Sequence, residues 1–504
     1  MQESYGHLFN QGLKCLSQRN SEQAIIYLAK FLQHEPINFE ANFYLGLAYA
    51  ENKNYKKSIE VLLNASVLGG GCEVFINLGI CHQKIGQLSE ALSCFDKAID
   101  ANPLNSSAWL NRGTALQDLY RLNDAILSYR EALKLNPSYD DAFVCMGNCY
   151  FKAGLYSNAL MFYEKSLSLY CSAGDTWFFK ALALEEIRET EKALIAYEKS
   201  FQFNQNTPYL LGALLHAQRK ICSWEYLEKN QINLEQNINK SEKVIFPFNF
   251  LSMSDSPGLL KMTSEIFSQD RHPVNPILGP IPKHPKKMKI RIGYFSADFR
   301  SHPVSFLTAE LFELHDKDKF EIIAFSFGPD DKSPMRLRLN QAFSQFIDVS
   351  GISDQKVAEL ARGLGIDIAI DLGGFTAHAR TSIFAYRAAP IQLSYIGYLG
   401  TMGAQYFDYL LADKTIIPKE LEHFYSEKIV YLPSYQVNDS RKEMADKAFT
   451  REELGLPSTG FVYACFNSNY KILPATFDGW MRILKATEKS VLFYMLNLLG
   501  RKLI

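Results

Sequence analysis

Apolar and small residues recur with a period of 33 or 34 residues over the first 207 residues of the chain. Within one unit, EVFINLGICHQKIGQLSEALSCFDKAIDANP, the large apolar residues Leu78, Phe95 and Ile99 follow helical spacing. One slot holds glycine in five units and alanine in the sixth: Gly12, Gly46, Gly79, Gly113, Gly147 and Ala181. A second slot, twelve residues further on, is always small: Ala24, Ser58, Ala91, Ala125, Ala159 and Ala193. The pattern predicts six helical hairpins whose two helices cross closely at the small residues.

This period and these slots are typical of tetratricopeptide repeats, so residues 1–207 are predicted to form six of them. Prolines end three units: Pro36, Pro103 and Pro137. One repeat cannot bury its apolar face alone. Six are therefore expected to stack into a right-handed solenoid with a concave groove.

Three asparagines occupy one helix position, two residues before the glycine slot: Asn10, Asn77 and Asn111. A side-chain amide both donates and accepts hydrogen bonds, so it can hold a peptide backbone without reading its sequence. We predict that these residues bind acceptor proteins or peptides in the groove. The alternative is that they are ordinary polar residues on an exposed helix face.

From residue 289 onward, short runs that are apolar on both faces alternate with amphipathic helical stretches. KIRIGYFS, FEIIAFSFG, IDIAIDLGG and IQLSYIGY have the first pattern, and VSFLTAELFELH and SDQKVAELARGLG have the second. Such alternation predicts a parallel sheet with crossover helices, a Rossmann-like lobe over residues 289–455. Ligands of such sheets bind outside the carboxyl ends of the strands. Residue His302, in ADFRSHPVSFL, follows the first strand and precedes a helix.

The segments on either side of this lobe have different characters. Residues 208–288 lose the repeat but begin with an amphipathic stretch and end in Pro-rich sequence, which predicts a helical cap and a linker. FVYACFNSNYKI predicts the first strand of a second α/β unit over residues 456–504. The expected fold is thus an α solenoid followed by α/β lobes.

Composition excludes several classes of protein. The 504 residues are 47% hydrophobic and 21% charged, which is globular, and the net charge of -1 gives no general attraction to nucleic acid or membrane. The N-terminus has no secretory signal, and no apolar run reaches the roughly 18 residues of a membrane span. The nine cysteines are scattered without metal-ligand spacing. We therefore expect free thiols, a cytoplasmic location, and no metal.

Several motifs together resemble those of the O-linked N-acetylglucosamine transferase family, with its bacterial and plant Spindly-like relatives. They are RIGYFSADFRSHPVSFL, DLGGFTAHAR, RAAPIQLSYIGYLGTMG, DYLLADKTIIP, YSEKIVYLP and FNSNYKI. The resemblance implies two facing Rossmann-like lobes of the glycosyltransferase-B type. It also implies transfer of N-acetylglucosamine from its UDP donor to Ser or Thr hydroxyls of proteins, with inversion and without a metal or other cofactor. Some relatives transfer fucose.

By this resemblance His302 is the candidate catalytic base, because it matches the His of the family motif DFxxHP. An attacking hydroxyl must lose a proton, and His titrates near working pH. Alternatively His302 holds the loop by hydrogen bonds or only orients the substrate. The neighbouring Asp298 is expected to be a helix cap or a salt-bridge partner.

The resemblance also implies a set of donor-binding residues: Lys471, Ser468, Thr376, Gly397, Leu399 and Thr401. Lys471 matches the family lysine at the donor pyrophosphate, where a cation stabilises the leaving UDP. Two positions depart from the family, because Ser468 stands where many members have Gln and Leu399 where they usually have Pro. His378 is a second titratable candidate. For the glycines, an ordinary tight turn is the alternative.

The second α/β unit, residues 456–504, is short for a nucleotide-sugar lobe, which takes on the order of 100 residues. We therefore expect the donor pocket to be incomplete in this chain. Two functions remain open at this point. The chain is a glycosyltransferase, or it is a repeat scaffold that binds proteins without catalysis.

Overall fold

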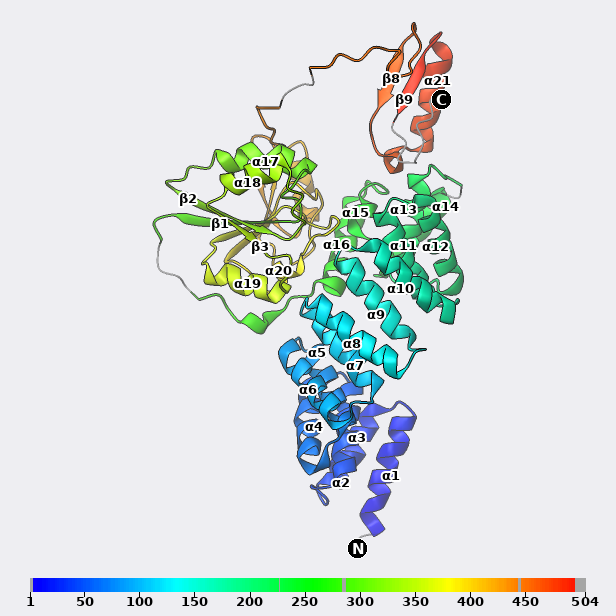
Figure 1. Ribbon diagram of the computed structural model, residues 1–504, viewed down its shortest axis with the longest axis vertical. Coiled ribbons are helices and arrows are strands. Elements are labelled where there is room, and N and C mark those ends of the chain that lie inside the picture. Colours follow the sequence, from blue (N-terminus) through cyan, green and yellow to red (C-terminus); the bar gives the residue numbers. More distant parts are fainter. Residues whose placement is uncertain (1–2, 226, 283–286, 443–445, 495–504) are drawn as a thin grey trace. The chain divides into compact units, whose positions relative to one another are not determined.

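The structure is a computed structural model that describes residues 3–225, 227–282, 287–442 and 446–494. The chain forms two compact units, Met1–Ser172 and Ala173–Ile504. Figure 1 shows helices alone in the first unit and both helices and strands in the second. No helix among the described residues is both long and apolar enough to cross a bilayer.

The first unit is a stack of five helical hairpins (Figure 1). Its helices are α1 Glu3–Ser17, α2 Ser21–Leu32, α3 Phe39–Glu51, α4 Tyr55–Gly69, α5 Cys72–Lys84, α6 Leu88–Ala101, α7 Ser106–Asp118, α8 Leu122–Leu135, α9 Asp140–Lys152 and α10 Tyr156–Leu169. The glycine slot is explained by the residue sixteen positions later. A Cβ atom at Gly113 would lie 2.4 Å from the ring of Tyr129, and one at Gly147 would lie 2.4 Å from Tyr163. The predicted close helix crossing is confirmed.

The second unit begins with the sixth hairpin, α11 Gly174–Glu186 and α12 Thr190–Phe203. It continues with α13 Leu210–Lys220, α14 Leu227–Asn239, α15 Pro247–Phe250, α16 Pro257–Arg271 and the 3-10 turn η1 Pro276–Leu278. Helix α13 packs on α12. It therefore covers the apolar face that the last repeat would otherwise expose.

A parallel sheet of seven strands follows, in the order β3-β2-β1-β4-β5-β6-β7. Its strands are β1 Ile290–Ser296, β2 Phe320–Ser326, β3 Gln345–Asp348, β4 Ile368–Asp371, β5 Ile391–Ser394, β6 Tyr409–Ala412 and β7 Lys428–Tyr431. The accompanying helices are α17 Pro303–Glu313, α18 Pro334–Ala342, α19 Asp354–Gly363, α20 Ser382–Ala385 and the 3-10 helix η2 Lys419–Phe424. Figure 1 shows α17 and α18 on one face of the sheet and α19 and α20 on the other. The prediction of an α solenoid followed by a Rossmann-like α/β lobe is confirmed.

Each face of this sheet carries its own apolar core. Phe312 and Leu339 of α17 and α18 pack on one face, and Val357 and Phe384 of α19 and α20 pack on the other. All four side chains are buried. Because both faces are covered, the strands need apolar residues on both sides, which is the pattern read from the sequence.

A second, small parallel pair follows, β8 Val462–Cys465 and β9 Val491–Tyr494. The 3-10 turn η3 Asn469–Lys471 and helix α21 Pro474–Ala486 connect them. The strand expected in FVYACFNSNYKI is confirmed as β8. The remainder of the predicted unit, beyond residue 494, lies outside the described residues.

Candidate functional site

The strand order reverses direction between β1 and β4, because β1 leads to β2 on one side and β4 leads to β5 on the other. Phe295 at the end of β1 pairs with Asp371 at the end of β4. The chain therefore brings the 297–302 loop and the 372–378 loop to one place on the carboxyl edge. This is the site class expected from the sequence.

The loops at this edge approach one another very closely. A Cβ atom at Gly397, after β5, would lie 2.0 Å from the carbonyl oxygen of Leu372, after β4. Gly374 has a φ of +59°, and a Cβ atom there would lie 2.3 Å from the Cβ of Tyr398. Both positions require glycine for steric reasons, so the tight-turn reading accounts for Gly397 without a ligand.

His302 is the N-cap of α17, since its Nδ1 accepts a hydrogen bond from the backbone N–H of Val304 at 3.3 Å. The same nitrogen lies 3.5 Å from Oδ2 of Asp298. Burial is the main cause that lowers the pKa of His302, while the Asp298 carboxylate raises it and Arg300 lowers it further. Asp298 also lies 3.6 Å from Arg300, so the salt-bridge reading of Asp298 is confirmed and the cap reading is wrong.

The two partners of Nδ1 favour different forms of the His302 ring. Accepting from Val304 requires a bare Nδ1 and places the proton on Nε2. Donating from Nδ1 toward Asp298 leaves Nε2 bare and able to take a proton. The side chain is 33% exposed, so a substrate can reach it. Only the second form is a general base through Nε2, and Asp298 is the residue that favours it.

Asp371 was not singled out from the sequence, yet it is the most perturbed carboxyl at this edge. It is 2% exposed, and its Oδ1 accepts from the N–H of Gly373 at 2.9 Å. Its buried Oδ2 has no hydrogen-bond partner among the described residues. Burial raises the pKa of Asp371 to about 7. Its register partner Ser394 also has a buried hydroxyl without such a partner.

The loop after Asp371 carries two predicted residues. The hydroxyl of Thr376 donates to the carbonyl oxygen of Gly373 at 2.8 Å, so it braces its own turn. His378 is exposed, has a φ of +63°, and its Nε2 lies 3.6 Å from Glu186 of α11. Donor contact by Thr376 stays a prediction, which its half-exposed position permits.

The loop after β5 is braced from two sides. Thr401 is buried, its hydroxyl donates to Oε2 of Glu427 at 2.6 Å, and it accepts from the N–H groups of Gly403 and Ser426. Burial raises the pKa of Glu427. Ser268 of α16 donates to the carbonyl oxygen of Met402 at 2.6 Å. The Thr401 hydroxyl is thus engaged within the protein.

Leu399 occupies the same loop with a different environment. Its side chain is 46% exposed. Gly397 of the same loop is half-buried. Donor binding by Gly397, Leu399 and Thr401 stays a prediction.

The segment after β7 crosses the carboxyl edge of the sheet. The N–H of Tyr435 donates to Asp413, which follows β6, and its carbonyl oxygen accepts from Tyr395, which follows β5. Residues 438–442 then attach to α17, the helix that His302 caps. The segment thus contacts the loops after β5 and β6 before it reaches α17.

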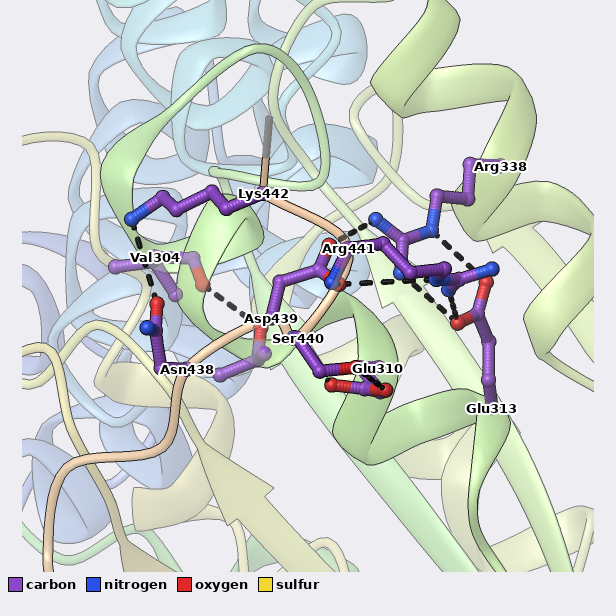
Figure 2. Close-up of polar contacts among 10 residues, drawn as sticks. Val304, Glu310, Glu313, Arg338, Asn438, Asp439, Ser440, Arg441 and Lys442 are labelled. Carbon is purple, nitrogen blue, oxygen red and sulfur yellow. Dashed lines mark hydrogen bonds and ion pairs between the residues drawn. The ribbon is translucent and has the colours of Figure 1, made fainter. Parts of the chain in front are cut away.

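Figure 2 shows how that segment is attached to α17 and α18. Ser440 donates to Glu310 from its backbone N–H at 2.7 Å and from its hydroxyl at 2.5 Å. Arg441 donates to Glu313, which also accepts from Arg338 at 2.9 Å. Arg338 in turn donates to Asp439. These contacts attach residues 439–441 to α17 and α18.

The predicted donor residues Ser468 and Lys471 belong to the η3 turn after β8. Ser468 is the N-cap residue of the turn and is half-buried, and Lys471 is exposed. The described residues form no ion pair with Lys471 that would neutralise it. Its position at the end of a strand agrees with the expectation, and its donor contact stays a prediction.

Two of the three predicted groove asparagines form hydrogen bonds within their own helices. The amide nitrogen of Asn77 donates to the carbonyl oxygen of Glu73 at 2.8 Å, and that of Asn111 donates to Ser107 at 2.8 Å. Asn10 is exposed. The bonds orient Asn77 and Asn111 and leave their amide oxygens as acceptors. Peptide binding by the three stays a prediction.

Comparisons with known proteins divide the chain in the same way as its fold. Residues 279–448 and 445–499 match the sequence model of "Glycosyl transferase family 41", and residues 9–66, 77–140 and 110–175 match "Tetratricopeptide repeat". No group of three or more His, Cys, Asp or Glu side chains in the described part of the chain could hold a metal ion.

Three similar proteins carry related names. A probable UDP-N-acetylglucosamine–peptide N-acetylglucosaminyltransferase SEC of Arabidopsis thaliana is 33% identical over 303 residues, 56% of this chain and 31% of that protein. A Caenorhabditis elegans protein named for the same activity is 34% identical over 170 residues, 33% of this chain and 15% of its own length. A Thermobaculum terrenum O-GlcNAc transferase mutant structure has 20% identity and a TM-score of 0.45, covering 84% of this chain and 68% of its own. The chain spans less than a third of the curated relatives' length.

Proposed function

Because residues 279–499 belong to glycosyl transferase family 41, we propose that this chain takes part in transferring a sugar from a UDP-sugar to Ser or Thr hydroxyls of proteins. UDP-N-acetylglucosamine is the proposed donor, since the curated relatives are named for it. The observation that carries the proposal is the reversal of strand order between β1 and β4. It brings the His302 loop to the edge where ligands of such sheets bind.

In the proposed mechanism His302 acts on the acceptor hydroxyl and Lys471 acts on the leaving UDP. As the acceptor hydroxyl attacks the anomeric carbon, its proton moves to Nε2 of His302, and Asp298 stabilises the imidazolium that forms. The bond from the anomeric carbon to the UDP oxygen breaks with inversion. The Lys471 ammonium stabilises the negative charge that develops on UDP. This scheme needs no metal, so EDTA is expected to leave the rate unchanged.

The direct test uses labelled UDP-N-acetylglucosamine with a library of Ser- and Thr-containing peptides, with the His302→Ala variant as control. In a preparation of the protein that transfers sugar, we expect label in peptide with the parent and at least tenfold less with the variant. GDP-fucose serves as a second donor arm, because some relatives of the family transfer fucose. Labelling that is equal in parent and variant would show that His302 is not the base.

We propose that acceptor proteins bind in the groove of the solenoid through Asn10, Asn77 and Asn111. Replacing all three by Ala is expected to weaken the binding of an extended peptide, each lost hydrogen bond contributing roughly 1 kcal/mol. Fluorescence anisotropy measures the change. A matched control replaces Asn52, Asn102 and Asn136, which are helix C-cap residues. Equal effects in the two triple variants would contradict the groove assignment.

A scaffold that binds proteins without catalysis is the second candidate. It is favoured by the division of the chain, because the first five hairpins form a compact unit of their own. Such a unit can bind peptide without donor chemistry. Calorimetric titration with UDP separates the two candidates, since a scaffold binds peptide but not UDP.

A cytoplasmic location is part of both proposals, and it agrees with nine free cysteines. Cell fractionation tests it.

A further inference from the structure

The η3 turn that carries Lys471 is held by a helix that lies some 250 residues earlier in the sequence. Arg219 of α13 donates from Nε to the carbonyl oxygen of Tyr470 at 3.1 Å. In the opposite direction, the amide of Asn469 donates to the carbonyl oxygen of Lys220 at 3.3 Å. The turn and the end of α13 are therefore joined by two hydrogen bonds in opposite directions, each from a side chain of one to a backbone carbonyl of the other.

Arg219 joins the turn to a second part of the helical region. It is 2% exposed, and its Nη2 donates to the carbonyl oxygen of Ser252 at 2.6 Å. The ring of His216, one turn earlier on α13, lies 4.8 Å from the ring of Tyr470. An arginine fork with both arms on backbone carbonyls fixes the distance between them, as a flexible lysine could not.

Burial in this region is concentrated at the same turn. Of the described residues in 446–494, only Asn469, Ile472 and Leu492 are buried. The first two lie on either side of Lys471, whereas the ammonium-bearing residue is itself exposed. The turn is thus buried on both sides of Lys471, whose own side chain is exposed.

We propose that Arg219 and His216 are positioning residues that hold the 469–471 turn against α13 and thereby set where Lys471 meets the diphosphate of the donor. This rests on the proposed function in one respect, the contact between Lys471 and UDP. An exposed ammonium on a mobile loop gains little from a charged partner. Fixing its backbone lowers the entropy lost on binding.

Amide hydrogen exchange of the purified 504-residue chain tests whether Arg219 holds the turn. Arg219→Met keeps an unbranched side chain of similar length but removes both donors. We expect exchange in a peptide covering 466–472 to become about tenfold faster, with the β1 to β7 peptides unchanged. The matched control is Arg362→Met, since Arg362 also donates to backbone carbonyls, those of Tyr386 and Leu278. Equal exchange of 466–472 in parent and Arg219→Met would overturn the proposal.

Calorimetric titration with UDP tests whether the hold acts through Lys471. Arg219→Met is expected to weaken UDP binding about tenfold in the parent background and not at all in a Lys471→Met background. Losses that simply multiply in the double variant would overturn the positioning role and leave the proposed function intact. A Lys471→Met variant that binds UDP as the parent does, or a parent that binds none, would overturn the donor role of Lys471 and this proposal with it.

Discussion

The loop of His302 and the turn of Lys471 look alike in the sequence but are held in different ways. Each follows an apolar strand and precedes a helix. His302 is held by its own lobe, through the N–H of Val304 and the carboxylate of Asp298. The turn of Lys471 is held by Arg219 on α13, far away in the sequence. A motif thus locates a reactive group on a loop without revealing what fixes that loop.

The two regions also differ in how they respond to acid. Burial raises the pKa of Asp371 at the His302 edge to about 7, so protonation favours its folded form. Burial is the main cause that lowers the pKa of His216, beside the Lys471 turn, to about 3, with Lys220 and Arg219 contributing. Protonation of His216 therefore favours the unfolded form. Acidification is expected to strengthen one region and weaken the other.

The largest expected effect separates catalysis from donor binding. In a transferring preparation of the protein, His302→Ala is expected to lower the transfer rate by roughly 10²–10⁴-fold, the usual contribution of a general base. UDP affinity is expected to be unchanged, because His302 and the Lys471 turn are held independently. Initial rates and calorimetry measure the two quantities. A large loss of UDP affinity in His302→Ala would show that the two regions are not independent.

The second prediction concerns Asp371→Asn. The folded pKa of about 7 lies above the unfolded value near 3.8, so the parent loses stability as pH rises from about 4 to 7. The total change is at most about 4 kcal/mol, at 1.36 kcal/mol per pKa unit. The asparagine variant is expected to lack this slope, as urea denaturation at several pH values would show. Asp413→Asn is the control, because hydrogen bonds lower the pKa of that carboxyl and its removal leaves the Asp371 slope in place. A parent without the slope contradicts the prediction.

Asp371 shows why part of the site could be predicted and part could not. The repeats were predictable, because the contact of Gly113 with Tyr129, sixteen residues later, lies within one hairpin and has a counterpart in each of the five units with a glycine in this slot. The position of His302 was predictable from a strand, a proline and a helix in succession. Asp371 has the same kind of position, at the end of β4. Applying the carboxyl-edge rule to every strand would have found its position, but its burial depends on how the loops around it pack in the completed fold.

The other parts of the site that the sequence did not predict depend on contacts between residues far apart in the chain. Nothing around Arg219 indicates that it reaches Tyr470, since the two lie 251 residues apart. Likewise Thr401 was a donor candidate because of its loop, but its hydroxyl is engaged by Glu427, 26 residues later. Local patterns predict elements and their ends. The partner of a buried polar group depends on the completed fold.

The third prediction is the acid response of the other region, through His216→Phe. The folded pKa of about 3 lies below the unfolded value of 6.5, so the parent loses stability as pH falls below about 6.5. At pH 4.5 the loss is about 3 kcal/mol, at 1.36 kcal/mol per pKa unit. Phenylalanine keeps a ring against Tyr470 and removes this loss. Hydrogen exchange of α13 peptides at pH 6.5 and 4.5 measures it. An equal pH response in parent and variant would contradict the assignment to His216.

The smallest expected effect is a gain rather than a loss. Ser468 is the N-cap residue of the η3 turn and its side chain makes no cap hydrogen bond, whereas the family resemblance implies a Gln at this position. Since α13 already holds the turn, Ser468→Gln is expected to add one hydrogen bond to the donor at little entropic cost, roughly 1 kcal/mol or about fivefold in UDP affinity. The gain should vanish when Arg219 is also replaced by Met, because the longer side chain would then project from a mobile loop. Calorimetric titration with UDP of the two single variants and the double variant measures whether the gain in affinity depends on Arg219. A gain that survives Arg219→Met would show that the turn keeps its place without α13, and the contrast between the two regions would fail.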